Sequence, residues 1–288
     1  PYSMGGDKLG SRMTYGNYLQ LDKLLTLQSG PDGHDPLPSN HEMHFIVVHQ
    51  AFELWFKQIN RELEDTLQLM NNDEIDETNI PVIVRHLERC SEIFRLLASQ
   101  WKVMETLSPQ DFLAFRDRLG TSSGFESWQL RTLEMLLGLK SEQRIGGMDP
   151  MEHNKKLHSE GKLSDEVMAN MERIATLPSL YDVLLRWLER TPVNGVSGDK
   201  EVMTEFVESH ISSMIEHGET VISHMVKIGH GNEETIRPRI TAGIDAAREF
   251  LLPSGEVSFS RAGLLFIESY RELPLLSWPR RLIDTVVD

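Results

Sequence analysis

A histidine stands within an unusually apolar and aromatic stretch, HFIVVHQAFELWFKQI, which covers His44–Ile59. Phe45 and His49 are four residues apart, so in a helix their side chains lie on the same face. A histidine in such surroundings can hydrogen-bond a polar atom of a ligand in a mainly apolar pocket. The alternative is an ordinary core histidine with a protein partner, and the spacing alone favours that alternative.

An arginine within a second apolar pattern is the other candidate for chemistry. In DFLAFRDRLGTSSGF (Asp111–Phe125), Phe112, Arg116 and Leu119 follow the spacing i, i+4 and i+7, which predicts one stripe of a helix. An arginine on an apolar stripe loses hydration unless an anion pairs with it. A substrate carboxylate could do so with two hydrogen bonds, but the pattern alone favours a salt bridge to a nearby acidic side chain. The turn Ser122–Gly124 offers hydroxyls and backbone amides, either to a ligand or as helix caps.

The histidines elsewhere follow no established metal-binding motif. The sequence contains no GxGxxG, P-loop, HExxH or GxSxG pattern. His210, His217 and His224 recur every seven residues, a rise of ~10.5 Å on a helix, which is too far for two of them to share one ion. His41 and His44 are three residues apart and could share a metal on a helix face, although an exposed first turn explains them equally well.

Helical periodicity dominates the chain, and no segment shows a convincing strand alternation. The longest pattern begins at SNHE (Ser39–Glu42), which has the form of a capping box, and runs to about Met70. Further helices are expected at about Pro81–Glu105, from SPQD (Ser108–Asp111) to near Gly120, at Phe125–Leu139, Ser179–Arg190, Lys200–Gly229, Glu233–Leu252 and Ser260–Tyr270, and from Pro279.

The sequence therefore predicts an all-α fold, a helical bundle of long helices forming a single domain over residues 1–288. Residues 1–20 are expected to form an N-terminal arm. Residues 140–163 are polar and contain Gly146, Gly147 and Pro150, so they are expected to form a loop-rich stretch with a short helix at most.

Composition excludes several classes of partner. The formal net charge of −15 argues against nucleic-acid binding, because phosphate recognition needs a basic face. No apolar run reaches the ~18 residues of a membrane span, and the N-terminus lacks the pattern of a signal peptide. The single cysteine, Cys90, excludes an internal disulfide. We therefore expect a cytoplasmic protein without nucleic-acid or membrane partners.

Six blocks of the chain together resemble one known family. They are TYGNYLQLDKLLTLQ (Thr14–Gln28), HEMHFIVVHQAFELWFKQI (His41–Ile59), METLSPQDFLAFRDRLGTSSGFESWQLR (Met104–Arg131), WLERTP (Trp187–Pro192), SGEVSFSRAGLLFIESYRE (Ser254–Glu272) and LLSWPRRLIDTVVD (Leu275–Asp288). In this order they resemble tryptophan 2,3-dioxygenases nearly from end to end. The resemblance implies an all-helical enzyme with heme b that adds dioxygen across indole C2–C3 of L-tryptophan to give N-formylkynurenine. It also implies a homotetramer whose N-terminal arms are exchanged between subunits.

The resemblance implies a role for individual residues of the site. His49 matches the distal histidine that contacts the indole nitrogen, and Phe45 matches an aromatic residue beside the indole. Phe112 matches the position against the substrate ring. Arg116 matches the arginine that binds the substrate carboxylate, and this match reverses the preference for a salt bridge.

Other matched residues have less direct roles. Leu119, Ser123 and Gly124 match residues that line the pocket. Tyr15 and Tyr18 match tyrosines that reach into a neighbouring subunit's site and help to close it. A candidate secondary tryptophan site is implied at Trp187, Arg190 and Pro192.

The chain also departs from the family's pattern. It has Asn40-His41-Glu42 where the family usually has His-Asp-Glu, and His44 where an apolar residue is common. In the family, the helix that supplies the axial heme histidine follows the segment matched here by LIDTVVD. We therefore expect that ligand, and the family's glycine-rich substrate loop, beyond Asp288. Three alternatives stay open. They are a related monooxygenase acting on a modified tryptophan or other aromatic amino acid, a heme- or indole-binding sensor without turnover, and a helical interaction module without a cofactor.

Overall fold

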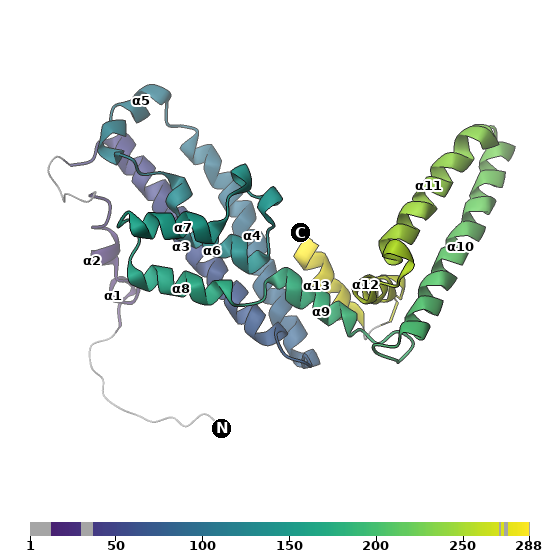
Figure 1. The fold of residues 1–288 in the computed structure, drawn as a ribbon. Coiled ribbons are helices and arrows are strands. Elements are labelled where there is room, and N and C mark those ends of the chain that lie inside the picture. The colour runs from purple at the N-terminus through teal and green to yellow at the C-terminus, as the bar shows by residue number, and fades with distance from the viewer. Residues whose placement is uncertain (1–12, 30–36, 271, 274–275, 288) are drawn as a thin grey trace. The chain divides into compact units, whose positions relative to one another are not determined.

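The computed structural model describes residues 13–29, 37–270, 272–273 and 276–287. Helices account for almost all regular structure in this part of the chain (Figure 1), which contains no β-strand and one isolated bridge between Val193 and Val196. The predicted all-α fold is therefore confirmed. Residues 1–12 of the expected N-terminal arm lie outside the described residues, as does any ligand beyond Asp288.

Backbone contacts divide the chain into two compact units, Pro1–Phe56 with Ile93–Ser127, and Lys57–Glu92 with Trp128–Asp288. Single-domain organisation stays a prediction. The first unit contains α1 (Tyr15–Leu19), α2 (Leu21–Leu24), the first part of α3 (Asn40–Met70), the last part of α4 (Ile80–Met104), α5 (Pro109–Leu113), and the 3₁₀ turns η2 (Arg116–Leu119) and η3 (Gly124–Glu126).

The start of α3 follows from its local sequence. The Oγ of Ser39 accepts a hydrogen bond from the backbone N–H of Glu42 at 3.1 Å, as the capping pattern predicts. The Glu42 side chain does not return to the cap, however. Its Oε2 accepts a hydrogen bond from Nη1 of Arg118 at 2.9 Å, so the helix start is joined to η2.

The prediction of one helix from Ser108 to Gly120 is wrong. The cap is as predicted, since Ser108 Oγ accepts from the N–H of Asp111, but α5 ends at Leu113. At Phe115 the backbone leaves the helical region (φ −123°, ψ 1°), and residues 116–119 form the separate turn η2. Gly120 then reverses the chain with φ 56° and ψ −126°, a conformation that essentially only glycine adopts.

The second unit contains the remaining helices. They are α6 (Trp128–Leu137), α7 (Pro150–Ser159), α8 (Asp165–Ala175), α9 (Leu180–Glu189), α10 (Lys200–Lys227), α11 (Glu233–Leu251), α12 (Phe259–Ser269) and α13 (Ser277–Val287), together with the 3₁₀ turns η1 (Glu77–Asn79), η4 (Ser141–Gln143), η5 (Ile145–Gly147) and η6 (Pro253–Gly255). A buried cluster from α10, α11 and α12 includes Val207, Ile211 and Ala262. Helix α12 lies very close to α9 at Gly263, where a Cβ would stand 2.1 Å from the carbonyl oxygen of Leu188.

Two helices of this unit were not fully anticipated. The stretch 140–163 contains α7, whose ten residues exceed the short helix that its polar composition predicts. An Asp149 cap and the buried Asn154 and Leu157 explain how a polar segment forms this helix. Helix α8, capped by Ser164, lies in a segment for which no helix was predicted.

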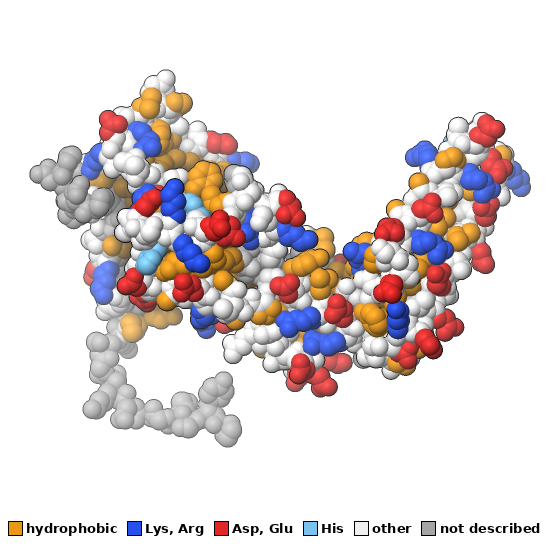
Figure 2. Space-filling model, viewed as in Figure 1, with side chains coloured by type: hydrophobic (Ala, Val, Ile, Leu, Met, Phe, Trp, Pro, Cys, Tyr) orange, Lys and Arg blue, Asp and Glu red, His pale blue; other side chains and the backbone are white. Residues whose placement is uncertain are grey.

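The face of the molecule in Figure 2 carries charged side chains of both signs. Acidic and basic side chains are interspersed over this face. Within the described residues, no helix combines the length and the apolar character needed to cross a membrane.

Candidate functional site

The first part of α3 presents Phe45 and His49 side by side, as their spacing predicts. Their ring centroids are 4.1 Å apart, and His49 Nδ1 lies 2.9 Å from the carbonyl oxygen of Phe45. Because a carbonyl oxygen can only accept, Nδ1 carries a proton in this arrangement. Neutral His49 therefore keeps the lone pair on Nε2, which has no hydrogen-bond donor among the described residues. The geometry leaves Nε2 available to accept a hydrogen bond from an N–H group.

Three phenylalanines gather next to this histidine. The ring centroid of Phe45 lies 5.8 Å from that of Phe112 and 5.6 Å from that of Phe115, and the last two are 5.4 Å apart at an edge-to-face angle of 83°. These distances are typical of favourable aromatic pairs. We call Phe45, His49, Phe112 and Phe115 the aromatic cluster. Phe112 lies on α5 and Phe115 directly before η2, so the two rings that contact Phe45 stand on either side of the end of α5.

Phe115 is the member of the cluster that the sequence did not single out. It is 3% exposed and so anchors the start of η2. Its position three residues after Phe112 was a usable signal, because residues at that spacing share a helical face. The prediction that Phe112, Arg116 and Leu119 form one helical stripe is wrong, since α5 and η2 are separate elements.

Arg116 is the first residue of η2 and is half-buried. Its Nη1 donates to the carbonyl oxygen of Gly120 at 2.9 Å. No Asp or Glu pairs with it among the described residues, so the salt-bridge alternative finds no partner there. The Gly120 carbonyl uses one of the five guanidinium N–H groups, and it provides no compensating charge. A half-buried arginine of this kind can bind a carboxylate.

The turn after η2 has a capping role. Ser123 Oγ accepts from the N–H of Phe125 at 3.3 Å and so starts η3 at Gly124, which is the alternative that the sequence left open for this turn. Leu119 ends η2 and is half-buried. A pocket-lining role for Leu119, Ser123 and Gly124 stays a prediction.

The tyrosines of the N-terminal segment do not belong to a packed core. Tyr15 and Tyr18 lie on α1, which Thr14 caps by accepting from the N–H of Asn17 at 3.2 Å. Tyr15 is 77% exposed and Tyr18 is 75% exposed. Two adjacent aromatic side chains this exposed are available to another surface.

The residues of the candidate secondary site lie at the end of α9 in the second unit. Trp187 packs against a buried cluster that contains Leu188 and Ile267. Arg190 Nη1 donates to the backbone carbonyl of Asn72 at 3.0 Å, which ties α9 to the end of α3. Pro192 follows the helix and is exposed. Trp187 and Arg190 thus have structural contacts, and a second tryptophan site stays a prediction.

The histidines at the start of α3 do not assemble a metal site. His41 Nε2 lies 3.5 Å from Asp111 Oδ1. The buried Nε2 of His44 has no hydrogen-bond partner in the described part of the chain. Across the described residues, no group of three or more His, Cys, Asp or Glu side chains is arranged to hold a metal ion.

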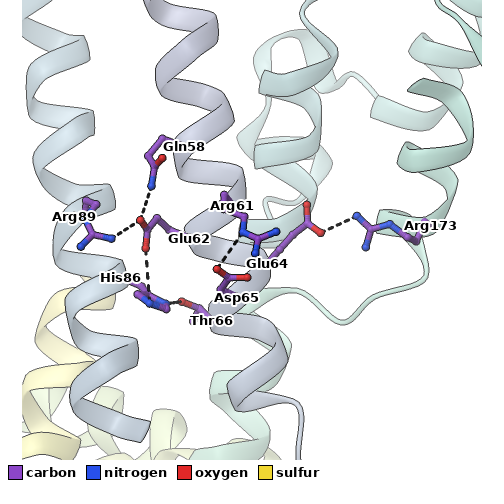
Figure 3. Close-up of polar contacts among 9 residues, drawn as sticks. All are labelled: Gln58, Arg61, Glu62, Glu64, Asp65, Thr66, His86, Arg89 and Arg173. Atoms are coloured by element: carbon purple, nitrogen blue, oxygen red, sulfur yellow. Dashed lines mark hydrogen bonds and ion pairs between the residues drawn. The ribbon is translucent and has the colours of Figure 1, made fainter. Parts of the chain in front are cut away.

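The second part of α3 carries a different polar group, which the sequence analysis missed (Figure 3). Glu62 is 5% exposed, and its Oε1 accepts from Gln58 Nε2 at 2.5 Å and from Arg89 Nη1. His86 on α4 lies 3.9 Å from the other carboxylate oxygen and also contacts Thr66. We call Gln58, Glu62, Thr66, His86 and Arg89 the Glu62 network. Each of these residues contacts another of them, which is typical of buried polar groups that stabilise the packing of two helices, here α3 and α4.

Burial next to this carboxylate also affects the single cysteine. Cys90 is a free, buried thiol on α4. Loss of hydration, followed by the negative charge of Glu62, raises the pKa of Cys90 to about 12. The thiol is therefore protonated at neutral pH and is a weak nucleophile.

Comparison with known proteins gives one consistent answer. Residues 4–288 match the family model described as tryptophan 2,3-dioxygenase. A protein named tryptophan 2,3-dioxygenase from Sorangium cellulosum is 36% identical over 99% of this chain and 72% of its own length. One named tryptophan 2,3-dioxygenase 2 from Ralstonia nicotianae is 35% identical over 96% of this chain and 78% of its own. A tryptophan 2,3-dioxygenase from Anopheles gambiae is 36% identical over 99% and 73%.

Proposed function

The chain belongs to the tryptophan 2,3-dioxygenase family, and we propose that it is a heme-dependent oxygenase that adds dioxygen across C2–C3 of the indole of L-tryptophan. The C2–C3 bond breaks, both oxygen atoms enter the product, and the product is N-formylkynurenine. Proteins with this name from bacteria and insects support this activity for the chain.

The observation that carries the proposal is Arg116, which directly follows Phe115 of the aromatic cluster in the chain and has no acidic partner among the described residues. Tryptophan offers groups that match both. Its carboxylate can take two hydrogen bonds from the Arg116 guanidinium. Its indole ring can pack against Phe45 and Phe112, since apolar surroundings with a few directed polar groups are typical of small-molecule sites.

His49 completes the match through its free Nε2. The indole N–H is a donor, and neutral Nε2 is an acceptor. Because indole N–H is a very weak acid, we assign His49 a hydrogen-bonding and orienting role and no obligatory proton abstraction. Holding the ring and the carboxylate at fixed points is itself catalytic, because it removes orientational freedom before the reaction.

The residues of the aromatic cluster fit the substrate side of a heme site. The Nε2 of His49, which has no donor among the residues that the structure describes, lies next to flat apolar rings, where an indole can lie beside a planar cofactor. Heme b, when bound, supplies the oxygen chemistry. We assign no axial ligand among the described residues.

We further propose that Tyr15 and Tyr18 contact a neighbouring subunit in a homotetramer. Their exposure supports this, because large aromatic side chains left this accessible are typical of interaction surfaces. A cytoplasmic location is also proposed, supported by the unpaired state of the only cysteine, Cys90.

The decisive experiment is turnover of L-tryptophan by the heme-loaded enzyme under ¹⁸O₂, with the product analysed by mass spectrometry. Two labelled atoms in N-formylkynurenine are expected. One labelled atom, together with a requirement for a reductant, would instead identify a monooxygenase. Binding of tryptophan or heme without oxygen consumption would identify a sensor.

A further inference from the structure

The guanidinium of Arg116 can bind a carboxylate only if η2 is held in place against α3. Continuation of α5 cannot hold it, because α5 ends at Leu113 and the backbone leaves the helical region at Phe115. A short 3₁₀ turn with a glycine at its end has little stability of its own. The position of Arg116 therefore depends on side-chain contacts between η2 and other elements.

Among the described residues, α3 contacts both Arg118 of η2 and Phe115, the residue directly before η2. On one side, Phe115 is buried against the ring of Phe45. On the other, Arg118 Nη1 donates to Glu42 Oε2 at 2.9 Å. The contact between Phe115 and Phe45 is apolar, so it does not fix the orientation of η2 relative to the Phe45 ring. The contact between Arg118 and Glu42 is a charge-assisted hydrogen bond with a defined direction.

Glu42 is a firm anchor for this bond. It lies in the first turn of α3, where the helix dipole stabilises a negative charge, and Ser39 holds its backbone N–H. It is 5% exposed, so the carboxylate needs a positive partner to compensate for lost hydration. Arg118 provides that charge, and the pair therefore fixes the register of η2 on α3.

Arg116 is tied into the same turn. Its Nη1 donates to Gly120 O, two residues after Arg118. The guanidinium is thus fixed to η2 by Gly120, and η2 is fixed to α3 by Arg118. Since α3 also carries Phe45 and His49, this chain of contacts sets the distance between the carboxylate-binding group and the ring-binding groups.

We propose that the Arg118–Glu42 ion pair is a positioning pair that aims Arg116 at the substrate carboxylate. This proposal rests on the proposed function. Neither Arg118 nor Glu42 is assigned a contact with substrate. The pair acts through Arg116, so its effect is expected on recognition of the carboxylate and not on recognition of the indole ring.

The test compares Arg118→Gln with the unchanged heme-loaded enzyme. The variant should weaken binding of L-tryptophan about tenfold, because a misplaced guanidinium loses most of a charge-assisted bond. Inhibition by tryptamine, which has the indole ring but no carboxylate, should be unchanged. An equal weakening of both ligands would show a general distortion and would overturn the proposal, as would unchanged tryptophan binding.

A double substitution separates positioning from an independent role. If Arg118 acts through Arg116, Arg116→Leu with Arg118→Gln should bind tryptophan no more weakly than Arg116→Leu alone. Additive losses would contradict the proposal. Arg118→Lys keeps the charge and should restore part of the affinity. If Arg118→Gln unfolds, Glu42→Gln, which changes the other partner of the ion pair, replaces it in the same comparison. Failure of the unchanged enzyme to bind tryptophan would instead refute the proposed function.

The chain offers a matched control. Arg173 on α8 donates to Glu64 on α3 at 2.7 Å, an ion pair between two elements of the second unit. Arg173→Gln removes an arginine–glutamate bond between two helices, a more exposed one than Arg118–Glu42, without changing η2. Its tryptophan affinity should equal that of the unchanged enzyme, and thermal unfolding of all variants shows whether each is folded.

Discussion

Helix α3 carries two polar regions that differ in how completely their hydrogen-bonding groups are used. In its second part, the buried Glu62 is surrounded by Gln58, Arg89 and His86. In its first part, His49 keeps an unused Nε2, and Arg116 on η2 has no acidic partner among the described residues. One region is closed by the protein's own side chains, and the other leaves its groups available to a ligand.

The difference separates stability from recognition. A buried polar group with a full set of hydrogen-bond partners contributes to a unique packing. When one partner is lost, the desolvation of the remaining buried group is no longer compensated, and the fold is destabilised. A group left without a partner gains little for the fold, but it can form a new bond with a substrate. Substitutions in the Glu62 network should therefore lower stability, and substitutions at Arg116 or His49 should lower catalysis.

The largest expected effect is on stability, from Arg89→Met. It leaves the Glu62 carboxylate buried with only neutral or distant partners, which should lower the free energy of unfolding by about 3 kcal/mol. Chemical denaturation measures this loss, and KM for tryptophan should not change. Adding Glu62→Gln to the variant should recover part of the stability, because the unpaired charge is then removed. A rise in KM without a loss of stability would break the distinction between the two regions.

Arg116→Leu should change KM for tryptophan and not stability, the reverse of Arg89→Met. Loss of a charge-assisted pair with the substrate carboxylate should cost ~2 kcal/mol of binding, which is about a 30-fold rise in KM. The free energy of unfolding should change little, because the residue's protein bond is one contact with the Gly120 carbonyl. Unchanged KM would refute the carboxylate role.

His49→Ala should have a smaller effect, on turnover. It removes one neutral hydrogen bond to the indole N–H, which corresponds to about a tenfold loss of kcat. The Soret absorption of the holoenzyme should remain, since we assign His49 no bond to iron. If the Soret band disappears in this variant, His49 holds the cofactor and the region has been misassigned.

The sequence predicted local features of this arrangement better than contacts between elements. The start of α3 at Ser39 and of α5 at Ser108 followed from caps, which depend on three or four neighbouring residues. The stripe spacing of Phe45 and His49 was equally local and was confirmed. The break at Phe115 had no such local signal, and the contact of Phe115 with Phe45 joins residues that lie far apart in the sequence.

Two further features, the burial of Glu62 and helix α8, were not predicted from the sequence, for different reasons. From the sequence alone, Glu62 is expected to be a solvent-exposed helix residue. Only the packing of α4 against α3 shows that it is buried. Helix α8 did have a signal, since Ser164 precedes two acidic residues and the apolar positions Met168, Met171 and Ile174. The family resemblance indicated Arg116 as the carboxylate ligand, but Arg118 emerged only from its bond to Glu42.

The smallest effect is expected from a polar group that has partners but is exposed. Asp182 Oδ2 accepts from the backbone N–H and the Oγ of Ser179 at the start of α9, and these hydrogen bonds lower the pKa of its carboxyl below the ordinary value. The stabilisation is thus fully present above about pH 4, the usual aspartate pKa, and is lost as the pH falls through the lower folded value. Asp182→Asn should lower the free energy of unfolding by at most about 1 kcal/mol near neutral pH, since solvent screens the exposed carboxylate.

Denaturation curves at pH 7 and pH 3 measure the Asp182 effect, which should shrink at the lower pH while KM for tryptophan stays constant at pH 7. Ser179→Ala provides the matched control, because it removes the hydroxyl partner of the same carboxylate. Together with Arg89→Met, these variants show whether stability losses in the second unit scale with burial of the carboxylate. An Asp182 effect as large as that of Arg89 would mean that burial does not distinguish the Glu62 network, and that α9 is held mainly by its cap.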